Sequence, residues 1–252
     1  MFAAFAVLSA LYLDQLTLIG LVFIITPFLI LRNKKRLESL FPTIYIDVFF
    51  GLYFVAMLLK LLPGFPDTVV LNQRIIGHAQ APFGITLNFS LPFAGLFLLA
   101  FYTKNITSIN DLRKTFFSKT GVMLWLGLPI VFFIPGILLG VKPEVKLLAI
   151  TPFVLACNLF LIAIPEEAFF RGFLQKRLQM VVGRFTLFLT PLLFTLYHLP
   201  SNYGVSISYF IIVFIAGSLF SFVFYKSDRV ESAIAAHFMI NAIHFVFLTY
   251  PY

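Results

Sequence analysis

Charged residues are scarce in this chain. Asp, Glu, Lys and Arg make up 11% of the 252 residues, whereas 61% are hydrophobic and 34 are Phe. A soluble domain carries charge at roughly a quarter of its positions. The chain has too few polar residues to cover a water-exposed surface, so its composition predicts a polytopic protein whose solvent is lipid.

Cysteine is also nearly absent. The single Cys157 excludes an intrachain disulfide, and no CxxC pair or Cys/His cluster offers a structural zinc site. We interpret Cys157 as a small buried apolar residue. The start of the chain lacks a basic segment before its apolar residues, which favours a retained membrane segment over a cleaved signal peptide.

Apolar stretches long enough to cross ~30 Å of hydrocarbon recur along the chain. They occupy residues 10–31, 43–62, 86–103, 121–140, 147–165, 185–199, 206–225 and 231–250. We therefore expect an all-α fold with about eight transmembrane helices. The whole chain, 1–252, is predicted to form one transmembrane domain, with N-terminal spans in 1–146 and a motif-bearing core at about 147–250. Residues 63–84 are expected to form the longest external connection.

The net charge of +8 does not indicate a nucleic-acid partner. If the chain crosses the membrane at every stretch, the loops on one side hold 14 of the 18 basic residues, in short runs between apolar stretches. This bias follows the positive-inside rule and predicts that the basic side is cytoplasmic, in contact with lipid headgroups. We expect a multi-pass protein of the plasma (cell inner) membrane. Asp14-Gln15 could mark the outer end of a helix, which puts the N-terminus outside, or the tip of a hairpin, which puts it inside; we prefer the first.

Three short motifs lie in the last third of the chain, in or beside apolar stretches. Ionisable groups are costly at bilayer depth, so several of them in one membrane domain indicate a functional site. The motifs are Glu166-Glu167-x-x-x-Arg171, Phe194-x-x-x-His198 and His237-x-x-x-Asn241.

The acidic motif predicts a division of labour between its two glutamates. On a helix, Glu167 and Arg171 are four residues apart and share a face, in the favourable order for an ion pair. Glu166 lies about 100° around the same helix and has no base at that spacing. We therefore expect Arg171 to hold Glu167 ionised, while Glu166 stays available as a general base.

The two histidine motifs supply groups that complement this acid. His237 and Asn241 are one helical turn apart, and both can donate hydrogen bonds to a developing oxyanion. Counted at ~1.5 Å per residue from the nearest cytoplasmic basic residue, Glu166, His198 and His237 lie about 12–21 Å deep. All three could therefore share one layer of the membrane.

The ordered trio EExxxR, FxxxH and HxxxN resembles the signature of the CPBP family, the type II CAAX prenyl endopeptidases and bacteriocin-processing relatives. The resemblance covers about residues 150–245. It implies an all-helical intramembrane endopeptidase with a cavity open to the cytoplasm and a prenylated or leader peptide as substrate. It also implies residue roles: Glu166 activates water with help from His198, His237 and Asn241 form the oxyanion site, and Glu167 and Arg171 support Glu166.

Three alternatives remain open from the sequence. Glu166, His198 and His237 could instead be a two-histidine, one-carboxylate set for zinc, with one open position. Buried Glu, His and Arg also line the paths of proton-coupled transporters, although no internal repeat is present. A non-catalytic bacteriocin-immunity protein could use the same pocket to bind a peptide.

Overall fold

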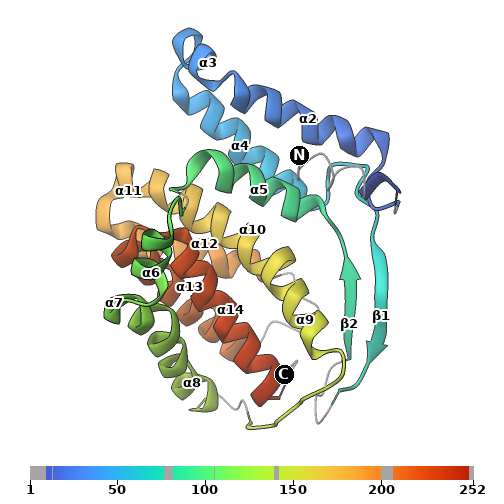
Figure 1. Cartoon of the computed structure of the whole chain (residues 1–252), viewed down its shortest axis with the longest axis vertical. Helices are drawn as coiled ribbons and strands as arrows, with labels where there is room; N and C mark the ends of the chain where they lie inside the picture. Colours follow the sequence, from blue (N-terminus) through green and yellow to red (C-terminus); the bar gives the residue numbers. More distant parts are fainter. Residues whose placement is uncertain are drawn as a thin grey trace.

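Helices dominate the fold, as the composition predicts. The computed structural model describes residues 10–12, 14–76, 82–104, 106–138, 142–199 and 207–249, and 75% of these residues are helical (Figure 1). The prediction of a mostly helical protein with apolar, membrane-type helices is confirmed.

The main helices of the N-terminal part begin after the turn at Asp14. They are α2 (Leu18–Arg32), α3 (Lys34–Leu40), α4 (Thr43–Leu58) and α5 (Ser90–Tyr102). Asp14 adopts a positive φ of 54°, and the Thr17 side chain then caps the first turn of α2 by accepting from the Gly20 backbone N–H. The apolar stretch 10–31 is therefore broken at Asp14, and its long helix begins only at Leu18.

A β-hairpin corrects the prediction of an all-α fold. Strands β1 (Thr68–Arg74) and β2 (Phe83–Leu87) pair antiparallel. They lie in the segment 63–84 that was expected to form an external connection, and β2 extends into the start of the stretch 86–103. The run Thr-Val-Val-Leu in β1 favours a strand because β-branched residues fit a pleated surface. Lys60 donates to both carboxylate oxygens of Asp67, at 2.7 and 2.8 Å, and lowers the pKa of that carboxyl.

A bent helical segment follows α5. It consists of α6 (Ile109–Phe116), α7 (Lys119–Val122), the π-helical turn η1 (Met123–Gly127) and α8 (Leu128–Leu138). The axes of Ile109–Phe116 and Lys119–Ile134 differ by 53°. The helix in the predicted stretch 121–140 thus begins slightly before that stretch, at Lys119.

The motif-bearing part of the chain begins with one continuous helical run. Its parts are α9 (Thr151–Cys157), η2 (Asn158–Ala163, π-helical), α10 (Ile164–Glu167), η3 (Ala168–Gln175, π-helical) and α11 (Lys176–Val182). The helix does not end at Pro165, the last residue of the predicted apolar stretch. Pro lacks a backbone N–H, and the wider π-helical turn before it lets the helix continue without the missing bond.

The remaining helices surround this run. They are the short 3₁₀ turn η4 (Gly183–Phe185), α12 (Thr186–Tyr197), α13 (Ile207–Ser227) and α14 (Val230–Phe247). Gly183 has a φ of +56°, which suits glycine, and the chain reverses there. As a result α12 runs back along the helix that it follows, and Tyr197 returns to Glu166.

Length and apolarity alone do not confirm the predicted number of membrane spans. In the described part of the chain, three helical stretches qualify, Thr151–Tyr197, Ile207–Ser227 and Val230–Phe247, and the bent pair around α7 would make a fourth. Three further apolar helices, Leu18–Arg32, Thr43–Leu58 and Ser90–Tyr102, are shorter. The expected count of eight is therefore not confirmed.

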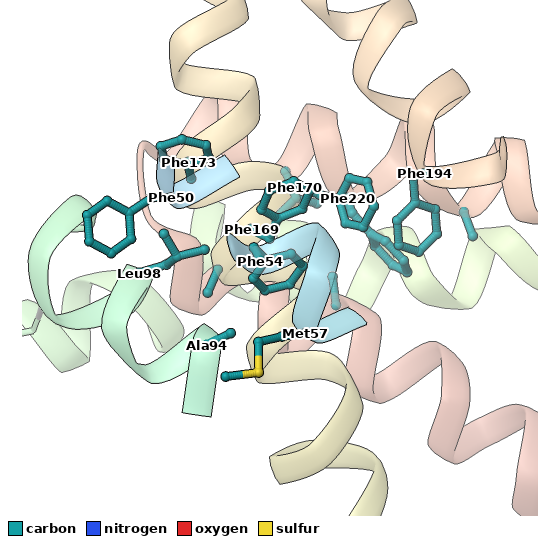
Figure 2. Close-up of a cluster of buried hydrophobic side chains, with 14 of the residues drawn as sticks. Phe50, Phe54, Met57, Ala94, Leu98, Phe169, Phe170, Phe173, Phe194 and Phe220 are labelled. Carbon is teal, nitrogen blue, oxygen red and sulfur yellow. The ribbon is translucent and has the colours of Figure 1, made fainter. Parts of the chain in front are cut away.

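Aromatic side chains fill the core between the N-terminal helices and the motif-bearing run. The ring of Phe54 stacks on that of Phe169 with centroids 4.0 Å apart and planes 1° from parallel. Figure 2 shows this pair with Phe170, Phe220 and Phe194 beside it. Rings of this size bury a large apolar area and hold the helices that bear them in fixed positions.

A glycine brings α5 against the residue that precedes the two glutamates. A Cβ added to Gly95 would lie 2.5 Å from the Cα of Pro165, closer than real Cβ atoms approach backbone. The absence of a side chain at Gly95 therefore sets how closely α5 approaches α10.

We predict that Gly95→Ala destabilises the protein by about 1–3 kcal/mol, the usual cost of overpacking. Gly51→Ala in α4 is the matched control, because its Cβ would meet only Phe173, at 3.7 Å. Thermal unfolding in detergent should give a lower midpoint for the Gly95 variant than for the control. Equal midpoints would contradict the close approach.

Candidate active site

The two adjacent glutamates of α10 are both buried. Glu166 is 4% exposed and Glu167 is fully buried, in a helical run that passes through the centre of the fold. A carboxylate removed from water needs hydrogen bonds or a counter-ion. The two side chains meet this need with different partners.

Glu167 joins a cation and an imidazole. Its Oε1 accepts from Arg171 Nη1 at 3.0 Å, so the ion pair expected from the spacing is present. The same oxygen lies 2.8 Å from His237 Nδ1 on α14. Because a carboxylate accepts, Nδ1 is the protonated nitrogen in this pair when Glu167 is ionised, and Nε2 is left for other contacts.

Arg171 is fully enclosed by protein. Its Nη2 donates to the backbone carbonyl of Gly217 on α13 at 2.9 Å. The guanidinium carbon lies 4.6 Å from the centre of the Phe194 ring and 5.3 Å from that of Phe220, which places the cation against two aromatic faces. The cation is therefore held by Glu167, a helix carbonyl and aromatic rings rather than by water.

Glu166 has a much weaker set of partners. Its Oε1 accepts a hydrogen bond of 3.3 Å from the Tyr197 hydroxyl, and its Oε2 is buried with no hydrogen-bond partner. An unsatisfied buried carboxylate oxygen is uncommon and marks a place where a further donor is expected. A water molecule or a substrate N–H could fill that role.

His198 is held in one tautomer by the backbone. Its Nδ1 lies 2.8 Å from the carbonyl oxygen of Phe194, four residues earlier. A carbonyl can only accept, so Nδ1 carries the proton and Nε2 keeps its lone pair. His198 therefore offers a proton acceptor.

These groups meet at one cavity of about 420 Å³. Its lining includes all four residues proposed for catalysis, which come from α10, the end of α12 and α14: Glu166, His198, His237 and Asn241. Glu167 and Arg171 lie behind this wall, outside the lining. The arrangement offers proton acceptors and hydrogen-bond donors to a molecule inside the cavity.

The zinc alternative gains no support from this geometry. Among the described residues, no three His, Cys, Asp or Glu side chains are grouped so that they could hold a metal ion. The proposed set of Glu166, His198 and His237 thus lines the cavity without forming a ligand cluster, and the metalloprotease interpretation is not supported.

Sequence reasoning missed three residues at this site. Tyr197 donates to Glu166, Phe220 stacks on the His237 ring with centroids 4.6 Å apart, and Asn158 lines the cavity with its Oδ1 buried and unpartnered. Tyr197 lies inside the FxxxH motif, directly before His198, and Asn158 is a lone polar residue in an apolar helix. Both features are visible in the sequence, but neither reveals its partner.

The fold and the cavity together define a helical membrane protein with a buried acid–imidazole–amide site. Residues 148–243 match the family model described as "Type II CAAX prenyl endopeptidase Rce1-like". This segment includes all three motifs, so the resemblance to the CPBP family is confirmed there, and the match supports a CAAX-type intramembrane protease family. No curated protein and no solved structure matched the chain.

Removal of the Arg171 charge should leave Glu167 uncompensated. We predict that Arg171→Met lowers the free energy of unfolding by about 3–5 kcal/mol, the usual cost of breaking a buried ion pair. Arg113→Met, at an exposed position of α6, is the matched control and should have little effect. Chemical unfolding in detergent micelles measures both.

The double variant Glu167→Gln/Arg171→Met tests the cause. If the loss comes from the unpaired charge, the second substitution should restore much of the stability. A double variant less stable than Arg171→Met alone would show that the loss comes from packing instead.

Proposed function

We propose that this protein is an intramembrane endopeptidase that hydrolyses a peptide bond of a membrane-associated peptide. The observation that supports it is that Glu166, His198, His237 and Asn241, from three helices, line one cavity. The Glu166 Oε2, which lacks a hydrogen-bond partner, would accept from a water bound there.

Glu166 and His198 would activate that water. The carboxylate of Glu166 takes a proton as the water oxygen attacks the scissile carbonyl carbon, and the lone pair of His198 Nε2 orients the second O–H. As the tetrahedral intermediate collapses, the C–N bond breaks. The proton held by Glu166 then passes to the leaving amine nitrogen.

His237 and Asn241 would stabilise the oxyanion. The Asn241 amide can donate directly, whereas His237 donates from Nε2 only when both ring nitrogens are protonated. Since the Glu167 carboxylate lies 2.8 Å from Nδ1, an imidazolium here would bond Glu167 through Nδ1 and the oxyanion through Nε2. In this role Glu167 and Arg171 would position His237, and they would also stabilise the fold around Glu166. Burial strengthens each of these electrostatic contacts.

The substrate class follows from the family and from the membrane setting. The matched family model describes prenyl endopeptidases, so a prenylated peptide is the first candidate and a leader peptide the second. We place the protein in the plasma membrane with the basic loops on the cytoplasmic side. Its partners would be membrane lipids and the peptide itself.

We predict that Glu166→Gln lowers turnover by about 10²–10⁴-fold, because an amide cannot accept the proton from water. The assay uses purified protein in liposomes and an internally quenched peptide that ends in a prenylated CAAX box. Glu38→Gln, which changes an exposed glutamate of α3, is the control and should retain full activity. Undiminished turnover of the Glu166 variant would end this mechanism.

We further predict that turnover does not depend on a bound metal ion, since the described cavity residues form no three-ligand group. Incubation with 1,10-phenanthroline should leave the rate unchanged, and metal analysis should find less than one zinc per chain. Loss of activity that added Zn²⁺ restores would favour the metal-dependent alternative.

A further inference from the structure

A second cavity, of about 370 Å³, adjoins the candidate active site. It lies between β2, the start of α5 and the helical run through α9 and η2. The two cavities share four lining residues: Leu91, Asn158, Ile162 and Tyr197. Because Tyr197 also donates to Glu166, the second cavity leads directly to the proposed general base.

The second cavity meets β2 along the edge of the strand. Its lining contains four consecutive strand residues, from Phe83 to Thr86. Successive side chains of a strand point to opposite faces, so a cavity over one face would contact every second residue. Contact with consecutive residues indicates that the cavity runs beside the backbone.

This edge of β2 has no strand against it. The sheet has two strands, and β1 covers the opposite edge. Figure 1 shows β2 between β1 and α9. Among the described residues, the backbones of Gly84, Ile85 and Thr86 make no hydrogen bond outside the hairpin. An unpaired edge is a template for another extended chain.

The hairpin is anchored so that this edge keeps its place. Asn88, directly after β2, donates to Asp67 at 2.8 Å and to the Phe65 carbonyl at 2.9 Å. Phe83 packs on Phe245 of α14 with ring centroids 5.5 Å apart. The strand is thus held at its end by the segment before β1 and along its face by α14, which bears His237 and Asn241.

Asn158 provides a polar contact where the two cavities join. Its Oδ1 is buried and has no hydrogen-bond partner. A carboxamide can accept from one backbone N–H and donate to one C=O, which suits an extended peptide. Of the other shared lining residues, Leu91 and Ile162 are apolar, and the Tyr197 hydroxyl already donates to Glu166.

We propose that the substrate polypeptide binds in extended conformation as an added strand along the free edge of β2. Its main chain would bond the Gly84–Thr86 backbone and the Asn158 amide, and its scissile bond would lie beside Glu166. At ~3.3 Å per residue, the five residues of β2 match a segment of about 17 Å. This assignment rests on the proposed function and specifies the substrate as an unwound segment next to the cleavage site.

The test uses the quenched prenylated peptide and a series of versions that each carry one backbone N-methyl group. Only alternate N–H groups of an added strand face its partner, so N-methylation should raise KM about tenfold at every second position, the factor for one lost hydrogen bond. An effect that is uniform along the peptide, or absent, would overturn the proposal.

Variants of the protein provide the second readout. Asn158→Leu should raise KM about tenfold and leave kcat within about twofold, because the lost contact is to the bound peptide rather than to the reacting atoms. Asn72→Leu on β1 makes the same change outside both cavities and should have no effect. A change in kcat alone for Asn158→Leu would contradict the assigned role.

Binding separates this proposal from the proposed function. Fluorescence anisotropy of the labelled peptide on the Glu166→Gln protein needs no cleavage. The alternating N-methyl pattern in Kd would support strand addition even if the chain proved not to be a protease. Cleavage that depends on Glu166, together with no alternation in Kd, would retain the enzyme and reject strand addition.

Discussion

The arrangement of the site depends on one buried carboxylate, that of Glu167. Its Oε1 receives hydrogen bonds from Arg171 and His237, and Arg171 in turn donates to the Gly217 carbonyl. These contacts tie the motif-bearing run to α13 and α14. Since a buried charge without a partner is costly, the three helices cannot separate without a large loss of stability.

Close backbone packing then determines where Glu166 lies. Gly95 lets α5 approach Pro165, and the π-helical turns on both sides of α10 change the direction of side chains without ending the helix. The reversal at Gly183 returns α12 along the same run, so that Tyr197 reaches Glu166. The position of the proposed base is thus a result of packing, whereas that of His237 is a result of charge.

Contacts between residues that are close in the sequence could be predicted at this site, whereas contacts between residues far apart in the sequence could not. The Glu167–Arg171 pair follows from helical spacing, and so does the common face of His237 and Asn241. The bond from His237 to Glu167 joins residues 70 positions apart, and no periodicity encodes it. The hairpin was missed because a stretch rich in Gly and Pro is typical of a loop. Hydropathy detects apolar stretches but neither the break at Asp14 nor the helix that continues past Pro165, so the predicted ends of these stretches differ from the ends of the helices.

Two adjacent glutamates acquire different chemistry from their neighbours alone. Glu167 accepts through its Oε1 from a guanidinium and an imidazole, and its Oε2 is buried without a hydrogen-bond partner among the described residues. Glu166 has one long hydrogen bond from a phenol and, unlike Glu167, lines the cavity, which is why we propose it as the general base. A single helical step of about 100° places one behind the cavity wall and the other in it. In the proposed mechanism the EE pair therefore combines a structural anchor and a reactive group in consecutive residues.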